Sequence, residues 1–351
     1  MRYVTCCAVW MTAMAAIGSA SAQEILSGDL MRVTGPFSGE QRQSVEAYLD
    51  HWGRQLIGAQ EVAQIAEARR KLIDPLTQAG ISDPFKTQYS ALVVPKISEG
   101  VTSKNFMVRL NTLIVIGHLS GGAGVEQMSM GLRDENAAVR YWAAKAIAES
   151  LGVANGAAVM TADQRSRIQK AIGEKLATEP SADVLEQMYD AMASLNTPES
   201  RKALVDAMNS RASYFAQNGL GVGLQAERTG LRRIYRVMLE AQIEGKADPV
   251  LIKNLAVVCD KYLQIISRAV EKRQLADAQL AVTQEIVEVA HPALNWAVKV
   301  FDPAAQPGPE LTDAFRNGTS DQYVQFRLNV LQWANVLKSG KIALTDDQLK
   351  P

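Results

Sequence analysis

Four arginines between positions 228 and 236 have the spacing that most suggests binding chemistry. Arg228, Arg232 and Arg236 are four residues apart, and Arg233 adjoins Arg232. Side chains four apart share one face of an α-helix, so a helix here would align the guanidinium groups in a stripe. Such a stripe could hold a carboxylate- or phosphate-rich partner through forked hydrogen bonds. The alternative is an ordinary solvated face whose charge is balanced by Glu227, Glu240 and Glu244.

Catalytic and metal-binding patterns are scarce in the chain. His51, His118 and His291 are its only histidines, and they form neither an HExxH motif nor a Cys/His cluster for zinc. No GxSxG elbow is present. We therefore expect no metal site and no cofactor, and we interpret His118 as a core or rim residue of a helix. Catalytic carboxylates need no local motif, so a helical enzyme with scattered Asp and Glu stays open as an alternative.

Two glycine-rich stretches resemble nucleotide-binding loops only superficially. Residues 221–226 match G-x-G-x-x-A, but dinucleotide binding requires a preceding strand in a parallel sheet, and none is visible. Residues 121–124 lack the Lys-Ser/Thr that a phosphate loop uses. We expect both stretches to be loops between helices.

Helix-start signals dominate the rest of the chain. Capping-box patterns occur at Ser38 and Thr161, each with a glutamine three residues later. Further starts are expected near Asp83, Ser181, Thr197, Asp248 and Ser320, three of which precede a proline suited to the first helical turn. The first helix is expected to be long and to end at Pro75, and Pro95 should kink the next one. Period-2 runs typical of strands are missing, which predicts an all-α protein.

An internal repeat appears when the chain is shifted by 31 residues against itself. The segment 105–109 then aligns with 136–140, and Ile116 aligns with Ile147. The second copy, residues 132–144, reads Leu-Arg-Asp-Glu-Asn-Ala-Ala-Val-Arg-Tyr-Trp-Ala-Ala. A helix pair repeated every 30–45 residues is typical of an α-solenoid.

The second copy resembles the HEAT-repeat family. The pattern of that family has an aspartate at the turn between two helices. Val-Arg follows at the start of the second helix, and small residues come after it. Those positions are held here by Asp134, Val139, Arg140, Ala143 and Ala144. The first copy keeps Val108 and Arg109 but has Ser103 in place of the aspartate. The resemblance implies that Asp134, Arg140 and Arg109 form a structural ladder between adjacent repeats.

The expected fold class is therefore all-α, with a right-handed HEAT-like solenoid of helix pairs between flanking N- and C-terminal helices. The solenoid should cover residues 83–245. An N-terminal helical segment, 23–82, precedes it, and long C-terminal helices follow at 246–301. We interpret 302–319, which contains several prolines and glycines, as a linker, and 320–351 as a terminal helix with a short, mobile polar tail.

Residues 1–22 have the features of a secretory signal peptide. A single charge at Arg2 precedes an apolar run, and Ala20-Ser21-Ala22 forms an Ala-x-Ala site before Gln23. Cleavage after Ala22 would leave Cys259 as the only cysteine, and its apolar surroundings indicate a buried small hydrophobe. No later apolar run is long enough to span a membrane. We expect a periplasmic or secreted protein.

The balanced charge of the chain argues against partners that are attracted over long distances. The chain has 37 basic and 37 acidic residues in 351, so no net field would recruit nucleic acid or an anionic membrane. The sequence favours an exported, non-catalytic binding or scaffold protein whose partner is another protein. The helical enzyme described above and a self-associating structural protein of the cell envelope are the alternatives. Arg228, Arg232, Arg233 and Arg236 are the candidate binding residues.

Overall fold

The computed structural model of this chain describes residues 25–152, 160–221, 223–272, 274–316 and 319–351. Every regular element in these ranges is helical, and they contain no strand, so the predicted all-α class is confirmed. The chain divides into two compact units, residues 1–164 and 165–351. None of the helices in the described ranges combines the length and apolar content needed to cross a lipid bilayer. The expected signal peptide, residues 1–22, lies outside the described residues.

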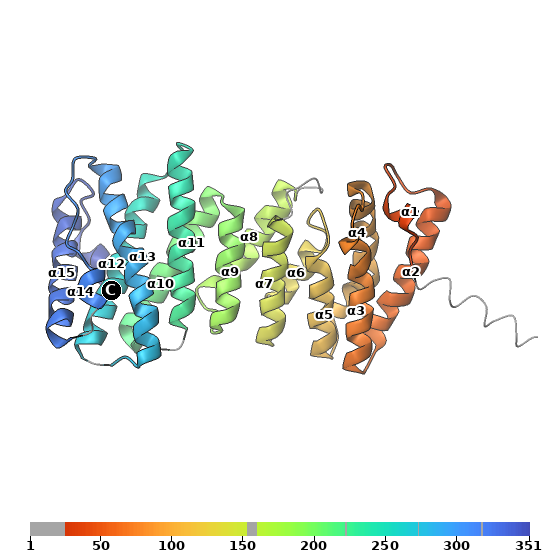
Figure 1. The fold of residues 1–351 in the computed structure, drawn as a ribbon, viewed down its shortest axis with the longest axis horizontal. Helices are drawn as coiled ribbons and strands as arrows, with labels where there is room; N and C mark the ends of the chain where they lie inside the picture. Colours follow the sequence, from red (N-terminus) through yellow and green to blue (C-terminus); the bar gives the residue numbers. More distant parts are fainter. Residues whose placement is uncertain (1–24, 153–159, 222, 273, 317–318) are drawn as a thin grey trace, which may run out of the picture. The chain divides into compact units, whose positions relative to one another are not determined.

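Unit 1 is built from short and medium helices that pack on their neighbours (Figure 1). Helix α5 contacts α3 and α7, and α2 contacts α3 and α4. The elements are α1 (Gly28–Met31), α2 (Gly39–Gly58), α3 (Val62–Thr77), α4 (Asp83–Ile97), the 3₁₀ helix η2 (Ser98–Thr102), α5 (Phe106–Gly117), α6 (Val125–Gly131) and α7 (Ala137–Gly152).

Unit 2 contains the longest helices of the molecule, with α12 at its centre. Helix α12 packs against α10, α13 and α15, and 16 of its 23 residues are buried, which explains its nearly continuous apolar sequence. The elements are α8 (Ala162–Leu176), which begins at the end of unit 1, α9 (Ala182–Leu195), α10 (Pro198–Asn218), α11 (Leu224–Ile243), α12 (Pro249–Glu271), α13 (Asp277–Phe301), α14 (Thr312–Arg316), α15 (Ser320–Ser339) and α16 (Asp346–Leu349).

The helix starts follow the capping chemistry of the sequence. Ser38 and Thr197 each accept a hydrogen bond from the backbone N–H three residues on, in reciprocal capping boxes. Thr161 and Gln164 make the same exchange. Asp248 accepts from the backbone N–H of Val250 and opens α12. Each side chain satisfies a backbone donor that the first turn leaves unpaired.

The first long helix was predicted wrongly. The chain breaks between α2 and α3, and Pro75 lies inside α3, which continues to Thr77. The break allows α2 and α3 to pack against each other, and this pairing buries Leu49, Leu56, Ile65 and Leu72 completely. Tertiary burial therefore outweighs the local signal for one continuous helix.

The segment expected as a linker and the expected mobile tail are both packed. Gly308 donates its N–H to Asn295, and the indole N–H of Trp333 donates to the carbonyl of Pro309. A Cβ on Gly308 would lie 2.2 Å from the Trp333 ring, so only glycine fits there. In the tail, Ile342, Leu344 and Leu349 are at most 4% exposed. The tail is polar in composition, but its few apolar side chains anchor it to unit 2.

Candidate functional site

The four candidate arginines lie on α11 but do not form one free stripe. Arg228 and Arg232 both reach Glu285 on α13, at 3.0 and 3.4 Å. Arg233 pairs with Asp190 on α9, on the other side of α11. Arg236 approaches Glu240 of its own helix at 3.5 Å. The structure thus gives all four a carboxylate partner within unit 2, and the first three connect α11 to its neighbouring helices.

The acidic residues expected to balance this stripe are placed differently. Only Glu240 contacts a stripe arginine, while Glu244 pairs with Lys246. In the solvated-face alternative Glu227 was one of the balancing acids, but its side chain is fully buried and pairs with Arg211 instead. Glu285, which follows Arg228 by 57 residues and Arg232 by 53, provides the balancing charge instead. No local spacing rule connects α11 with α13, so this partner could not be predicted from the sequence.

A buried polar cluster surrounds Glu227 at the start of α11. Its carboxylate accepts from Arg211 Nε of α10 at 2.5 Å, from the hydroxyl of Tyr262 on α12, and from that of Tyr189 on α9 at 3.5 Å. Burial raises the pKa of Glu227, and Arg211 and the two hydroxyls oppose that rise. Because the cluster takes one side chain from each of four helices, it fixes α9, α10, α11 and α12 relative to one another.

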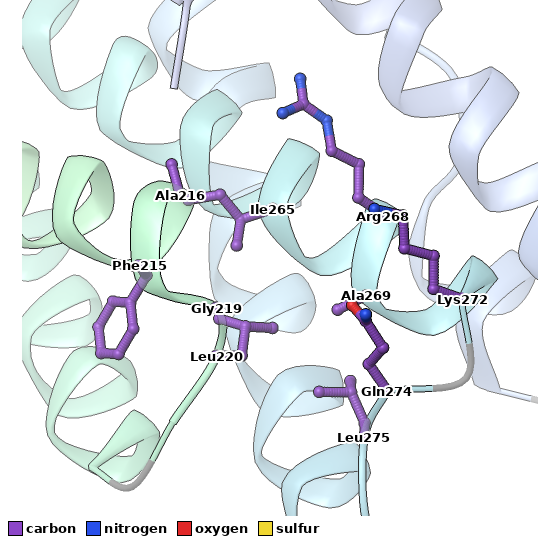
Figure 2. A pocket seen from close by; sticks show the side chains of 10 residues that line it. All are labelled: Phe215, Ala216, Gly219, Leu220, Ile265, Arg268, Ala269, Lys272, Gln274 and Leu275. Atoms are coloured by element: carbon purple, nitrogen blue, oxygen red, sulfur yellow. The ribbon is translucent and has the colours of Figure 1, made fainter.

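A pocket of about 450 Å³ opens beside this cluster, at the end of α10 and the last turns of α12 (Figure 2). Phe215 connects the two features, since its ring lies 6.5 Å from that of Tyr262 and 5.8 Å from the Arg211 guanidinium. The chain leaves α10 at Gly219, whose φ of 80° is a conformation that glycine adopts without strain. The lining residues are Phe215, Ala216, Gly219, Leu220, Ile265, Arg268, Ala269, Lys272, Gln274 and Leu275.

The pocket combines an apolar floor with two cations. Phe215, Ile265 and Ala269 are at most 7% exposed and form the floor. Arg268 and Lys272 are exposed residues one turn apart on α12, and Figure 2 shows both on the same side of the pocket. Arg268 donates to Gln264 at 3.2 Å, and neither cation forms an ion pair with any residue that the structure describes. Basic residues also complement the dipole at a helix C-terminus, which is their simplest structural role.

The structure places the three ladder residues around one turn of unit 1. Arg109 makes a two-pronged contact with Asp134, at 2.7 and 3.1 Å, which joins α5 to the turn before α7. Both side chains are about one-tenth exposed, at 11% and 10%. Arg140 donates instead to the backbone carbonyls of Asp134 and Glu135, both at 2.9 Å. Its guanidinium therefore braces the turn that presents Asp134 to Arg109.

A second, smaller cavity of about 320 Å³ in unit 1 gathers several polar side chains. It is lined by Leu76, Lys86, Gly117, His118, Ser120 and Glu149. His118 follows α5 as an exposed residue and donates from Nδ1 to the carbonyl of Ile114 at 2.9 Å. In the described ranges no three His, Cys, Asp or Glu side chains are grouped as metal ligands.

Cys259 and the glycine-rich loops have structural surroundings. Cys259 is fully buried, and burial raises the pKa of its thiol, as expected for a small hydrophobe in α12. In the described ranges no strand precedes residues 221–226, and Gly223 instead caps α11. Gly121, Gly122 and Gly124 all have positive φ and form the turn before α6. A Cβ on Gly124 would lie 2.5 Å from Ile116, so close packing also requires this glycine.

Comparisons with known proteins leave the family open. The chain matches no protein-family description and no curated protein. A crystal structure of an engineered protein aligns with this chain at a TM-score of 0.42 and 15% sequence identity. The match covers 70% of this chain and 97% of the engineered one.

Proposed function

We propose that this chain is an exported, non-catalytic binding protein that holds part of another protein in the pocket between α10 and α12. The observation that carries the proposal is the pairing of an apolar floor with two cations that have no ion pair among the described residues. The four arginines predicted from the sequence are occupied by carboxylates of the same chain. At Arg268 and Lys272, by contrast, a carboxylate of the partner would not have to displace a carboxylate of this chain.

Two further expectations belong to the same proposal. The Arg109–Asp134 contact between successive helix pairs supports a HEAT-like solenoid in unit 1, because a turn aspartate and a helix-start arginine are the features of that family. The Ala20-Ser21-Ala22 site supports export to the periplasm. Sequencing of the N-terminus of exported protein should begin at Gln23, and a retained Met1 on periplasmic protein would contradict this part.

Capture experiments with paired baits test the binding function. Wild-type protein and the pocket-filling variant Ala216→Trp would each be used to capture proteins from the native cell envelope, with mass spectrometry of what is retained. We expect Ala216→Trp to lose one or more proteins that the wild type retains. Arg232→Gln, at an exposed position on α11, is the control that should retain them. Identical sets from wild type and Ala216→Trp, at equal thermal stability, would refute the proposal.

Self-association is a second candidate function, which one helix face favours. Val324, Leu328 and Leu331 of α15 are each about half exposed, at 50%, 48% and 50%. Their spacing of four and three residues puts them on one face, opposite the buried Phe326 and Trp333. Asp321 precedes the face and Lys338 follows it, so a second copy of α15 lying antiparallel would bring opposite charges together.

The mass of the protein in solution decides this second candidate. Light scattering after size exclusion should show a concentration-dependent dimer for the wild type. Leu328→Glu places a charge at the centre of the face and should give a monomer with unchanged helix content. A wild-type monomer at the highest attainable concentration would exclude pairing through this face.

A further inference from the structure

We propose that the pocket between α10 and α12 recognises an extended acidic segment, with one apolar side chain on the floor and two carboxylates against Arg268 and Lys272. This inference rests on the binding function proposed above and names the chemistry of the partner. It follows from three properties of the pocket, which are its size, the spacing of its cations and the polar groups at its mouth.

The size fits a short stretch of chain. Ligand pockets of roughly 300–1,000 Å³ hold molecules of drug size, and a cavity of about 450 Å³ is at the small end of that range. The apolar part of the lining comes from Phe215, Leu220, Ile265, Ala269 and Leu275. In Figure 2, Leu220, Ile265, Ala269 and Leu275 lie below and beside the two cations, and Phe215 lies farther from them. One apolar side chain is therefore held on the floor while its flanking residues pass the cations.

The spacing of the cations selects how the acidic residues are arranged. Arg268 and Lys272 are four residues apart on a helix, which separates them by about 6 Å at a rise of 1.5 Å per residue. In an extended chain, residues i and i+2 point to the same side and lie about 6.6 Å apart. Two carboxylates separated by one residue therefore match both cations at once, whereas adjacent carboxylates point to opposite sides.

Polar groups at the mouth favour a peptide over a fatty acid. Gln274 and Gly219 are exposed lining residues, and the Gln274 side-chain amide has no hydrogen-bond partner among the described residues. A carboxamide both donates and accepts, so it can pair with the backbone of an extended peptide. An ionised fatty acid carries no donor, so it leaves the carbonyl oxygen of that amide without a partner. A fatty acid also carries one carboxylate and would leave one of the two cations unmatched.

Fluorescence anisotropy with defined peptides tests the assignment. The probe is a labelled peptide amide with the order leucine, phenylalanine, aspartate, serine, aspartate. A second peptide has both aspartates replaced by asparagine, and a third has them adjacent. The proteins are wild type, the double variant Arg268→Gln with Lys272→Gln, and the matched control Arg232→Gln with Arg236→Gln. The two double variants remove the same charge from exposed positions of long helices in the same unit.

We expect the first peptide to bind wild type and the control within a factor of two of each other. The pocket double variant should bind it at least tenfold more weakly at low salt, and this gap should narrow at high salt as the attraction is screened. The asparagine and adjacent-aspartate peptides should bind the wild type more weakly than the first. Competition with decanoate should require a far higher concentration than competition with unlabelled peptide.

Three results would overturn the inference. If the wild type and the pocket double variant bind the first peptide with equal affinity, Arg268 and Lys272 do not contribute to its recognition. Equal binding of all three peptides would remove the acidic requirement, and stronger competition by decanoate would assign the pocket to a lipid carboxylate. If any of these occurs while envelope capture still depends on Ala216, the ligand class is wrong and the binding function stands. If capture is independent of Ala216, the function itself fails.

Discussion

The pairs Arg109–Asp134 in unit 1 and Arg211–Glu227 in unit 2 perform the same task in different surroundings. Each ties a helix to another part of its unit through an arginine and a carboxylate, the first to the turn before α7 and the second to α11. Asp134 keeps 10% of its side chain exposed, whereas Glu227 is fully buried. The first pair is completed by the backbone N–H of Asn136, and the second by two tyrosine hydroxyls.

This difference decides what each pair contributes to stability. A carboxylate at a turn can be satisfied by nearby backbone donors, as Asp134 is by Asn136 at 2.8 Å. A carboxylate in a helical core must obtain every partner from other side chains, because helix backbone donors are already used. Glu227 therefore depends on three separate helices, and the loss of one partner leaves a buried charge that water cannot reach.

The largest effect should follow from Arg211→Ala. Removing one partner of a buried ion pair costs about 3–5 kcal/mol, because the remaining charge is uncompensated. Urea denaturation followed by circular dichroism measures the loss, and the transition that moves should be that of unit 2. The double variant Arg211→Met with Glu227→Leu removes both charges and should lose less than Arg211→Ala alone. A double variant as unstable as the single one would show that packing, not charge, sets the cost.

A smaller loss, about 2–3 kcal/mol, is expected for Arg109→Ala. Asp134 loses its two-pronged partner but keeps the bond from Asn136 and some contact with water. The control is Arg42→Ala, which breaks the exposed pair with Glu46 in the same unit and should cost well under 1 kcal/mol. If Arg109→Ala and Arg42→Ala prove equally stable, the contact between α5 and the turn before α7 does not stabilise unit 1.

A third carboxylate, Asp260, sharpens the comparison because it is buried without an arginine. Its Oδ2 accepts from Gln264 at 2.7 Å, and its Oδ1 has no partner among the described residues. Burial raises the pKa of Asp260 to about 7. A raised folded-state pKa means that the folded protein binds the proton more tightly, so this stability is present below about pH 4 and is lost as the pH rises toward 7.

Asp260→Asn should remove that pH dependence. The variant is expected to match the wild type near pH 4 and to exceed it at pH 8 by on the order of 4 kcal/mol, since the pKa of Asp260 rises from 3.8 to about 7 and one pKa unit corresponds to about 1.4 kcal/mol. Denaturation midpoints of both proteins at several pH values provide the test. The comparison between variants matters, because burial lowers the pKa of His291, and that group contributes a change of opposite sign. A constant difference across the pH range would exclude Asp260 as the source.

The contrast also explains which parts of the fold the sequence could predict. Helix starts at Ser38, Thr161 and Thr197 depend on contacts within three residues, and the structure has all three. The helix break before α3 was not predicted, because it depends on burial between two helices. The packed tail was missed for the same reason, since Leu344 and Leu349 are isolated apolar residues in a polar stretch.

In the candidate site, too, local features could be predicted from the sequence and long-range contacts could not. The spacing of Arg228, Arg232 and Arg236 correctly indicated a helix, but their partners come from other helices or from the next turn. Arg211 and Glu227 are 16 residues apart on consecutive helices, and no motif links them. The pocket left only an indirect signal, the glycines at 219 and 221 that mark the end of α10. Long-range partners are set by how helices pack, which local patterns do not encode.

The smallest effect in this series concerns Arg140, which the repeat pattern placed in the ladder with Asp134. Its role in the structure is less direct, because it donates to two carbonyls of the turn while Arg109 donates to the Asp134 carboxylate. Arg140→Ala removes these charge-assisted bonds and should cost about 1–2 kcal/mol, less than Arg109→Ala. The double variant of Arg109 and Arg140 should lose less than the sum of the two single losses if Arg140 holds the turn in the shape that Arg109 requires, because Arg140→Ala alone already weakens the contact that Arg109 makes. Strictly additive losses would make Arg140 an independent contact, and no change in the unit 1 transition for Arg140→Ala would remove it from the ladder.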